Sequence, residues 1–531
     1  MAYYRDLREY LAALERAGKL VRVQMAVDKD RELHPMVRVQ YRGLPESMRK
    51  AFLFENIHDV KGKKYTIPYV VCCMAGSKEI YALGLQCSPE EISARWEQAQ
   101  LHPLPPVTVA NGPVQEEVHV GDSLLAHGGI GEFPVPISTP GYDNAPYLTA
   151  PYWITRDPET GRHNIGTYRA QVKSPTRTGV SVHNPDSGLI LHWQKCRQLG
   201  KPLEAALVLG ASPNIAYVSV ARLPKDVDEY DVAGGIAGAG VEVVKCRTID
   251  VLVPAHAEIV LEGIIPTDTL EPEAPFGEAR GYMGHKMVTT FFEAHCITHR
   301  KNPILQGFLS QFPPSESSKL RGISGEQVLL KYLKHDSGIA DVLRVSLWES
   351  GASCTTYVVQ MKKSSPEAST RVLDALEKGG PHIGKVVIVV DEDINPEDQD
   401  MVSWALGRMM PHRDTRIIAA PIQLLDISAA PPEEDDRREP TFSDPAKASR
   451  LLIDATRKWP YPPVSLPKRQ YMERGLELWE KAGLPKPTLR EPWYGYALGY
   501  WNEESEEEAD LAVQGEYYQT GEKAIGQRKK I

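Results

Sequence analysis

The chain is poor in cysteine and contains no long hydrophobic run. Its seven cysteines are an odd number spread over 531 residues and form no C-x-x-C motif, so reduced thiols are expected rather than a disulfide framework. No run of about 18 apolar residues occurs, so no membrane-spanning helix is predicted. Residues 1–20 form a charged amphipathic segment without the apolar stretch of a secretory signal peptide. We therefore expect a soluble, cytoplasmic protein.

Signatures of several common function classes are also missing. The net charge is -9 and there is no long basic stripe, so neither a nucleic-acid nor a membrane partner is expected. Walker A and G-x-S-x-G motifs are absent, and the glycine cluster at 234–240 lacks the G-x-G-x-x-G order of dinucleotide-binding loops. His295 and His299 lie four positions apart, but their segment is strand-like and lacks the glutamate of H-E-x-x-H. Ordinary strand histidines are therefore favoured over a metal pair.

The composition and length of the chain are typical of a multidomain globular protein. Apolar residues make up 42% and charged residues 25% of the chain, which are ordinary values, and the length is too great for one core. The pattern predicts α/β structure to about residue 105, a β-rich barrel or sandwich from about 145 to 310, and α/β structure again to about 465. The acidic segment 431–444 is predicted to be a solvated loop. Beyond 470, a polar and aromatic extended arm is expected.

Local signals predict the positions of several elements. Asp6 and Glu9 form a D-x-x-E capping pattern at the start of a helix, and a strand is expected over 20–23. A short helix is expected after Ser77. Farther along, the runs on either side of Pro175 predict a β-hairpin.

The strand "IGTYRAQVK" before Pro175 carries an arginine of interest. Alternation with period 2 places Tyr168 on one face of the strand and Arg169 on the other. If the tyrosine face meets the core, Arg169 points to the surface or into a cavity. The pattern by itself leaves both alternatives open.

The stretch "EAPFGEARGY", residues 273–282, places two carboxylates around a Pro-Phe-Gly core. Glu273 and Glu278 are five positions apart, which would separate them on a helix. With Pro275 in its second position and Gly277 in its fourth, a type I turn is predicted that brings the two acids together. An arginine nearby would keep one carboxylate ionised, while burial would leave the other protonated.

A set of motifs follows in a fixed order along most of the chain, roughly residues 4–460. They are "DLREYLAALERAGKLVRV", "HNIGTYR", "DVDEYDVAG", "EAPFGEARGY", "THRKNPI", "VVIVVDEDINPED" and "LLIDATRKW". In this order they resemble the UbiD family of prenylated-FMN-dependent reversible (de)carboxylases. Ala274 stands where that family usually has glycine, and its methyl group is tolerated if the residue keeps a negative φ.

The resemblance implies a fold and a division into domains. The expected fold class is mixed α/β and β multidomain, with a central split β-barrel similar to flavin reductases and flanking α/β domains. The implied division is an N-terminal α/β domain at 1–115, a split-barrel prenylated-FMN-binding domain at 116–325, a C-terminal α/β domain at 326–465, and an extended arm at 466–531. The arm is expected to contact another subunit, and a homo-oligomer, dimer or hexamer, is implied.

The resemblance also implies a reaction. It is the non-oxidative, reversible decarboxylation of an aromatic, heteroaromatic or α,β-unsaturated carboxylic acid, or of an aromatic acyl-CoA, through a covalent prenylated-FMN adduct. Arg169, Glu273 and Glu278 would form the catalytic network, with Glu278 as proton donor. A flavin prenyltransferase would supply the cofactor. Two alternatives stay open, a split-barrel FMN oxidoreductase and a subunit of a larger carboxylase complex, although the intact network speaks against both.

A divalent metal, Mn²⁺ or Mg²⁺, is implied as the ion that holds the cofactor phosphate, with K⁺ close by. Its implied ligands are Asn164, Glu229 and His183, and His192 is the alternative to His183. Amide oxygen, carboxylate and one imidazole suit such hard cations better than soft ones. The residues implied to contact the cofactor are Asn164, Thr167, Tyr168, Arg169, Ser181, His183, Glu229 and Lys385.

Overall fold

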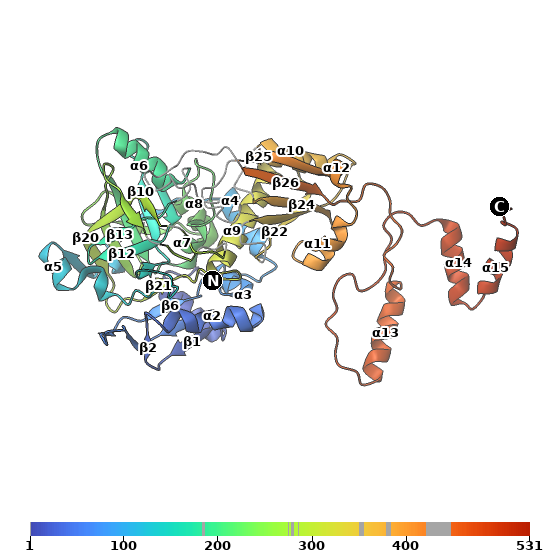
Figure 1. The fold of residues 1–531 in the computed structure, drawn as a ribbon, viewed down its shortest axis with the longest axis horizontal. Coiled ribbons are helices and arrows are strands. Elements are labelled where there is room, and N and C mark those ends of the chain that lie inside the picture. Colours follow the sequence, from blue (N-terminus) through green and yellow to red (C-terminus); the bar gives the residue numbers. More distant parts are fainter. Residues whose placement is uncertain are drawn as a thin grey trace.

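The computed structural model describes residues 2–182, 186–273, 275–277, 281–284, 286–349, 355–378, 384–420 and 448–530. These residues form an N-terminal α/β lobe, a central β-rich lobe, a C-terminal α/β lobe and an arm that leaves the body (Figure 1). The predicted acidic loop at 431–444 lies outside the described residues. Within the described ranges, no helix is long and apolar enough to cross a membrane, and the six cysteines found there are all free thiols.

The N-terminal lobe begins with the helix and strand that the local signals predict. The Asp6 side chain accepts a hydrogen bond from Glu9 N and caps the first helix, and Ser77 caps α3 in the same way through Ile80 N. Four strands form a sheet in the order β1-β3-β6-β21. The elements of this lobe are α1 (Leu7–Arg16), β1 (Leu20–Val23), β2 (Val27–Asp28), α2 (Leu33–Gly43), β3 (Ala51–Phe54), β4 (Ile57–His58), β5 (Lys64–Tyr65), β6 (Tyr69–Val71), α3 (Lys78–Gly84), α4 (Ile92–Leu101) and, from later in the chain, β21 (Leu305–Gly307).

The central lobe is built on a nine-stranded antiparallel sheet. Its order is β11-β10-β14-β17-β20-β13-β12-β9, with β8 paired to β20 off this path. The strands of this sheet are β8 (Glu117–Val120), β9 (Tyr147–Leu148), β10 (Tyr152–Arg156), β11 (His163–Thr167), β12 (Ala170–Ser174), β13 (Arg177–Gly179), β14 (Leu203–Leu209), β17 (Ile259–Ile265) and β20 (Phe291–His299).

Helices and smaller strands surround this sheet. The helices are α5 (Asp122–Ala126), the 3-10 turn η3 (Gly129–Glu132), α6 (Gly188–Gln198), α7 (Pro213–Val218) and α8 (Glu229–Ala237). The glycine cluster at 234–240 falls at the end of α8, where Gly234 and Gly235 approach the backbone of Leu104 and Ala99. The smaller strands are β7 (Val107–Thr108), β15 (Glu242–Lys245), β16 (Leu252–Pro254), β18 (Glu271–Glu273) and β19 (Met287–Thr289).

The central sheet curls until its ends meet. β11 is the first strand on the path and β12 the seventh, yet only Tyr168 and Arg169 separate them in the chain. Three Cα–Cα steps span at most about 11 Å, so the two strands must be neighbours in space. The sheet is therefore a curled antiparallel half-barrel within a mixed α/β multidomain fold. We call the junction of β11 and β12, residues 167–170, the seam.

The seam corrects the prediction of one continuous strand through Arg169. β11 ends at Thr167, whose N–H donates to Ser219 O, and β12 begins at Ala170. Alternation does not carry across this break, because the chain leaves the edge strand β11 and enters β12, next to the opposite edge strand β9. The hairpin predicted across Pro175 is confirmed, since β12 and β13 pair with Ser174 opposite Arg177.

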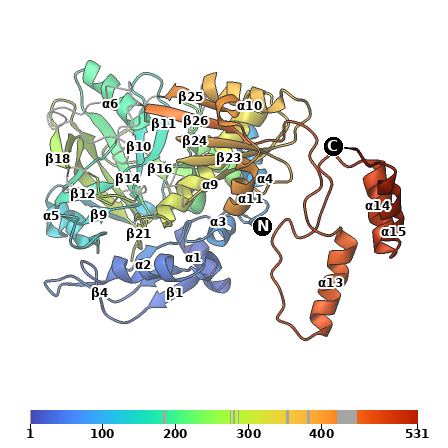
Figure 2. The same ribbon diagram turned by 45° about the vertical axis from the view of Figure 1, so that its right-hand side comes forward.

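The C-terminal lobe holds a second sheet, in the order β22-β23-β24-β26-β25. Its inner strands β23, β24 and β26 run parallel to one another, and helices lie beside them (Figure 2). The elements are α9 (Glu316–Lys331), a π-helical turn η4 (Tyr332–Asp336), β22 (Val342–Leu347), β23 (Thr356–Met361), α10 (Ala368–Lys378), β24 (Val386–Asp391), α11 (Gln399–Leu406), α12 (Pro411–Asp414), β25 (Thr415–Ala420) and β26 (Ala448–Asp454).

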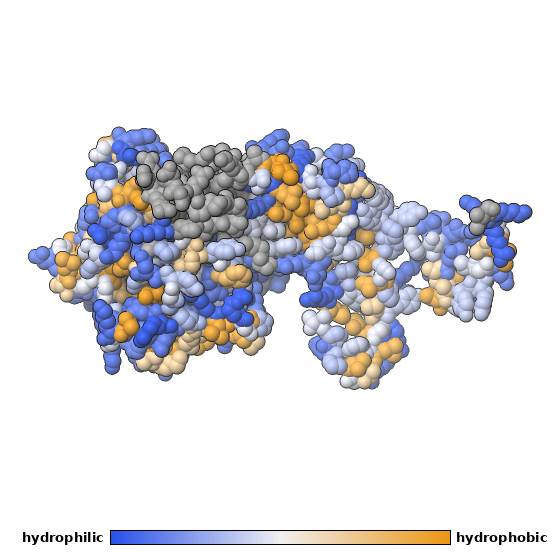
Figure 3. Space-filling model, in the orientation of Figure 1, coloured by the Kyte–Doolittle hydropathy of each residue, from blue (hydrophilic) through white to orange (hydrophobic). Residues whose placement is uncertain are grey.

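The arm carries three helices, α13 (Arg469–Lys481), α14 (Glu503–Val513) and α15 (Tyr517–Ile525), none of which has a buried residue. It reaches away from the body in Figure 1 and shows apolar patches on its surface in Figure 3. Its link to the C-terminal lobe includes a hydrogen bond from Tyr496 Oη to Asp393 Oδ2 at 3.0 Å. Apolar side chains are thus exposed along the arm, among them Tyr471, Leu478 and Trp479.

Candidate active site

The seam is held from both sides by hydrogen bonds to its backbone. Trp153 on β10 donates its indole N–H to Tyr168 O at 2.7 Å, and Ser181, after β13, donates its N–H to Arg169 O at 3.3 Å. Trp153 is fully buried and Ser181 nearly so. Neighbours from the two ends of the sheet therefore fix the direction in which Arg169 leaves the backbone.

Arg169 forms a buried ion pair with Glu273. Its Nε lies 2.9 Å from Glu273 Oε1, and the two side chains are 9% and 0% exposed. The guanidinium also lies over the ring of Phe276, 5.3 Å from its centroid. Burial raises the pKa of Glu273, and the charge and hydrogen bond of Arg169 oppose that rise. The structure thus brings together two of the three predicted catalytic residues, which are far apart in the sequence.

Gly179, at the end of β13, makes room for the Glu273 carboxylate. A Cβ atom at this position would lie 2.5 Å from Glu273 Oε2, closer than carbon and oxygen atoms can approach. Oε2 is buried and has no hydrogen-bond partner among the described residues. A glycine is therefore required here by the carboxylate rather than by an unusual backbone conformation. Sequence reasoning missed this residue, since nothing local marks it.

A second carboxyl group, Asp143, also lies close to Arg169. Burial raises the pKa of Asp143 to about 6, while a hydrogen bond from Thr139 N and the charges of Arg38 and Arg169 act against this rise. The Thr139 N–H donates to Asp143 Oδ2 at 2.6 Å. Arg38, from α2, donates to Ser310 O at 3.1 Å. Neither Asp143 nor Arg38 belongs to a motif that the sequence singled out.

On the other side of the seam, Glu229 contacts the strand that carries Asn164. Glu229 opens α8, and its Oε2 accepts a hydrogen bond from Ile165 N at 3.0 Å. Burial raises the pKa of Glu229 to about 8. The Asn164 amide packs on the first turn of α6, where a Cβ on Gly188 would lie 1.8 Å from its Oδ1. Its Nδ2 is buried without a hydrogen-bond partner in the described part of the chain.

These groups fit a hard divalent cation. An amide and a carboxylate offer oxygen atoms, which Mg²⁺ and Mn²⁺ prefer. A cation beside Glu229 would also neutralise a charge that burial disfavours. The unpartnered Nδ2 of Asn164 also agrees with a bound cation. The oxygen and nitrogen of a side-chain amide are distinguished by their hydrogen bonds, so a bound cation would decide which of the two atoms faces it.

Thr167 and Tyr168, the other two residues of the seam that are candidates for cofactor binding, follow Asn164 along the chain. Thr167 Oγ1 and Ser219 Oγ are 2.7 Å apart. Burial raises the pKa of Tyr168 to about 12, and the charges of Glu229, Arg222 and Arg321 have smaller effects on it. Two arginines that the sequence did not single out are thus close enough to influence the Tyr168 phenol.

Other predicted site residues are placed elsewhere or not described. Glu278 and His183 lie outside the described residues. His192 lies on α6 with its Nδ1 2.9 Å from Thr155 Oγ1 and its Nε2 3.9 Å from Asp157 Oδ2. Lys385 precedes β24 in the C-terminal sheet, where its carbonyl accepts a hydrogen bond from Leu451 N.

Three family models cover most of the chain. All three describe 3-octaprenyl-4-hydroxybenzoate carboxy-lyase: the N-terminal domain matches residues 11–99, the Rift-related domain residues 106–312, and the C-terminal domain residues 320–455. This chain belongs to the UbiD family. The resemblance seen in the motifs is confirmed.

Individual relatives and solved structures show how far the likeness extends. An uncharacterized protein of Aquifex aeolicus is 31% identical over 515 residues, which cover 91% of this chain and 99% of that protein. The evolved dimeric form of the UbiD-class enzyme HmfF from Pelotomaculum thermopropionicum, solved in complex with prFMN, has a TM-score of 0.73 at 30% identity, with 88% of this chain and 98% of that chain covered. The vanillic acid decarboxylase of Sedimentibacter hydroxybenzoicus in its closed form has a TM-score of 0.75 at 26% identity, with 97% and 100% covered.

Membership of the UbiD family assigns the class of reaction. Its members are carboxy-lyases, which add or remove a carboxyl group as CO₂, and this chain is an enzyme of that class. The buried Arg169–Glu273 ion pair lies at the seam, and Glu229 contacts β11, the strand that carries Asn164 and leads into the seam. They therefore form the candidate active site of a UbiD-class decarboxylase.

Proposed function

We propose that this UbiD-family chain catalyses the non-oxidative, reversible decarboxylation of an aromatic, heteroaromatic or α,β-unsaturated carboxylic acid, or of an aromatic acyl-CoA, with prenylated FMN. The observation that carries the proposal is the buried ion pair between Arg169 and Glu273 at the seam. Burying a cationic group with a carboxylate costs desolvation free energy, and buried, charge-paired groups of this kind cluster at functional sites. A relative at 30% identity that was solved with prFMN supports the choice of cofactor.

The ion pair can position a carboxylate substrate and a proton donor. Arg169 donates its Nε–H to Glu273, and the planar guanidinium is the side chain best suited to recognise a carboxylate. We assign substrate binding to Arg169 and the orientation of the proton donor to Glu273. Glu278 is proposed as the general acid that protonates the carbon that has lost CO₂. When bound, prenylated FMN supplies the sink for the electron pair left by that loss.

Cofactor binding is assigned to the Asn164 side of the seam. Asn164, Glu229 and His183 are the proposed ligands of Mn²⁺ or Mg²⁺, with K⁺ nearby. The hydrogen bond between His192 Nδ1 and Thr155 Oγ1, and the position of Nε2 3.9 Å from Asp157 Oδ2, favour His183 over His192 as the third ligand. Thr167, Tyr168, Ser181 and Lys385 are the further proposed cofactor contacts.

The finer description of the fold is also part of this proposal. We assign the curled sheet to a split barrel of the flavin-reductase type, within domains at 1–115, 116–325 and 326–465. The segment 466–531 is proposed to dock on a second copy of the chain, because its helices α13, α14 and α15 bury no residue of their own. A flavin prenyltransferase is the proposed source of the cofactor.

The first test is the mass of the small molecule released from the full chain after co-production with a flavin prenyltransferase. A prenylated FMN mass, followed by CO₂ release from a panel of carboxylic acids, would support the proposal. Plain FMN alone, when a known UbiD enzyme is loaded in parallel, would favour an FMN oxidoreductase. No flavin would refute the assignment of Asn164 and Glu229.

Matched variants separate chemistry from folding. Glu278→Gln and Glu273→Gln are each expected to retain cofactor and to lose turnover. Glu271→Gln is the control, because Glu271 lies on the same strand but pairs with Lys173 and Arg177 at the edge of the lobe. Turnover of Glu278→Gln equal to that of Glu271→Gln would rule out Glu278 as the proton donor.

A further inference from the structure

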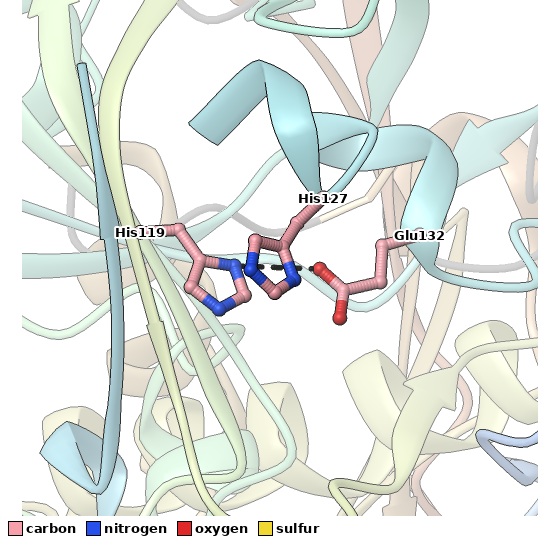
Figure 4. A group of neighbouring side chains, drawn as sticks. All are labelled: His119, His127 and Glu132. Carbon is pink, nitrogen blue, oxygen red and sulfur yellow. Dashed lines mark ion pairs between the residues drawn. The ribbon is translucent and has the colours of Figure 1, made fainter. Parts of the chain in front are cut away.

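Four titratable side chains meet at the rim of the central sheet, away from the seam. His119 lies on β8, His127 follows α5, Glu132 ends η3, and His299 ends β20. Figure 4 shows His119, His127 and Glu132 pointing toward one another. The pairing of β8 with β20, in which Ile297 lies opposite His119, brings His299 alongside.

The chain between His119 and Glu132 is folded back so that these residues meet. Gly128 and Gly129 have positive φ values of 88° and 56°, which favour glycine. A Cβ on Gly129 would lie 2.1 Å from Pro175 O, and Ile130 N donates to that oxygen at 2.7 Å. The loop is therefore seated on the β12–β13 turn, and this contact fixes the position of Glu132.

The donor atoms are close together, and three of them have no hydrogen-bond partner among the described residues. One ligand atom from each of His119, His127 and Glu132 can be chosen so that all lie within 4.8 Å of one another. His119 Nδ1 lies 3.5 Å from Glu132 Oε2, and His299 Nε2 lies 3.9 Å from Glu132 Oε1. Within the described residues His119 Nδ1, Glu132 Oε2 and His299 Nε2 are buried without a hydrogen bond. The whole residues His119 and His299 are only 5% and 6% exposed.

The hydrogen bond of His299 Nδ1 identifies the tautomer of its ring and shows that Nε2 can accept a metal ion. His299 Nδ1 lies 2.8 Å from Arg300 O, and a carbonyl oxygen only accepts, so Nδ1 carries the hydrogen. In the neutral ring, Nε2 then presents a lone pair toward a carboxylate oxygen. Two electron-rich atoms that face each other in a buried place repel, and a metal ion between them would remove this repulsion. A backbone carbonyl that orients the second ring nitrogen is a common companion of metal-bound histidine.

We propose that His119, His127 and Glu132, with His299 as the fourth donor, bind a divalent transition metal ion. Imidazole nitrogens with one carboxylate match Zn²⁺, which takes four ligands in closed sites. Nitrogen and oxygen ligands on a tetrahedral zinc ion lie about 3.3 Å apart, so the 3.5 Å spacing of His119 and Glu132 suits a shared ion. His127 is exposed and gives the ion a route from solvent. The ion would tie the segment from β8 to η3 to the end of β20.

The test is metal binding by the full chain after chelator treatment, with Zn²⁺ measured by mass spectrometry and Co²⁺ followed by visible absorption. Wild type is expected to bind one equivalent of Zn²⁺ more than His127→Ala or Glu132→Gln. It is also expected to show the strong absorption of four-coordinate Co²⁺, which these variants lose. The comparison between variants sets aside any ion held at Asn164 and Glu229.

The control is His295→Ala, which removes an exposed histidine from the same strand as His299. It should bind as much Zn²⁺ as wild type. Because His127 is exposed, its removal should leave the circular dichroism spectrum of the metal-free protein unchanged. Equal metal uptake by wild type and His127→Ala, or no Co²⁺ absorption in wild type, would overturn the proposal and leave a direct contact between His299 and Glu132.

Discussion

Replacing Gly179 with alanine tests the proposed catalytic ion pair without altering either of its members. The new Cβ would lie 2.5 Å from Glu273 Oε2, whereas ordinary contact begins at 3.4 Å. The carboxylate must therefore retreat by about 0.9 Å, because the β13 backbone that would carry the methyl group is held in the sheet. Glu273 is fully buried, so its side chain has no solvent to move into.

The expected cost follows from the hydrogen bond that this movement strains. Arg169 Nε donates to Glu273 Oε1 at 2.9 Å, and a shift of this size directed away from Arg169 takes the pair out of hydrogen-bond range. A buried bond to a charged group contributes about 1.5–3 kcal/mol. If Arg169 acts in the transition state, turnover by Gly179→Ala should fall roughly 10- to 150-fold.

The assay is kcat for CO₂ release with flavin content measured on the same sample. Flavin content is expected to stay at the wild-type level, since the described contact of Gly179 is with Glu273. Gly322→Ala on α9 is the control, because its Cβ would meet Leu347 at an ordinary 3.5 Å. A wild-type kcat in Gly179→Ala would refute the role given to the ion pair.

Three further outcomes are expected. Burial raises the pKa of Asp143 to about 6, so its neutral form stabilises the fold at about pH 4 and this stability is lost as the pH rises through about 6. The difference in Tm between wild type and Asp143→Asn should fall over that range, equivalent to at most about 3 kcal/mol, and a flat difference would contradict this. Glu316 accepts hydrogen bonds from three buried backbone N–H groups, so Glu316→Gln should lose about 1–3 kcal/mol of stability in urea unfolding. Glu326→Gln keeps an acceptor for its single N–H partner, Leu347, and should lose less; equal losses would count against this account. Removal of 466–531 should lower the oligomeric mass measured by light scattering, and an unchanged assembly would show that the arm is not the contact.

Local elements could be predicted from the sequence because their causes lie within a few residues. The Asp6 cap acts on the N–H three positions later, and the hairpin at Pro175 closes within its own turn. The β-rich texture of the central region and the order of the motifs likewise belong to the sequence. They were enough to predict the UbiD family and to name Arg169 and Glu273.

Only the tertiary structure decided which of these residues meet. Arg169 contacts Glu273 because the sheet curls until its first and seventh strands are joined by two residues, and no periodicity along one strand encodes that closure. The same long-range packing places Asp143 near Arg169 and His299 beside Glu132. The physical reason is that a side chain's hydrogen-bond partners and burial are set by strand pairing across the fold, whereas sequence patterns report only on the nearest turns.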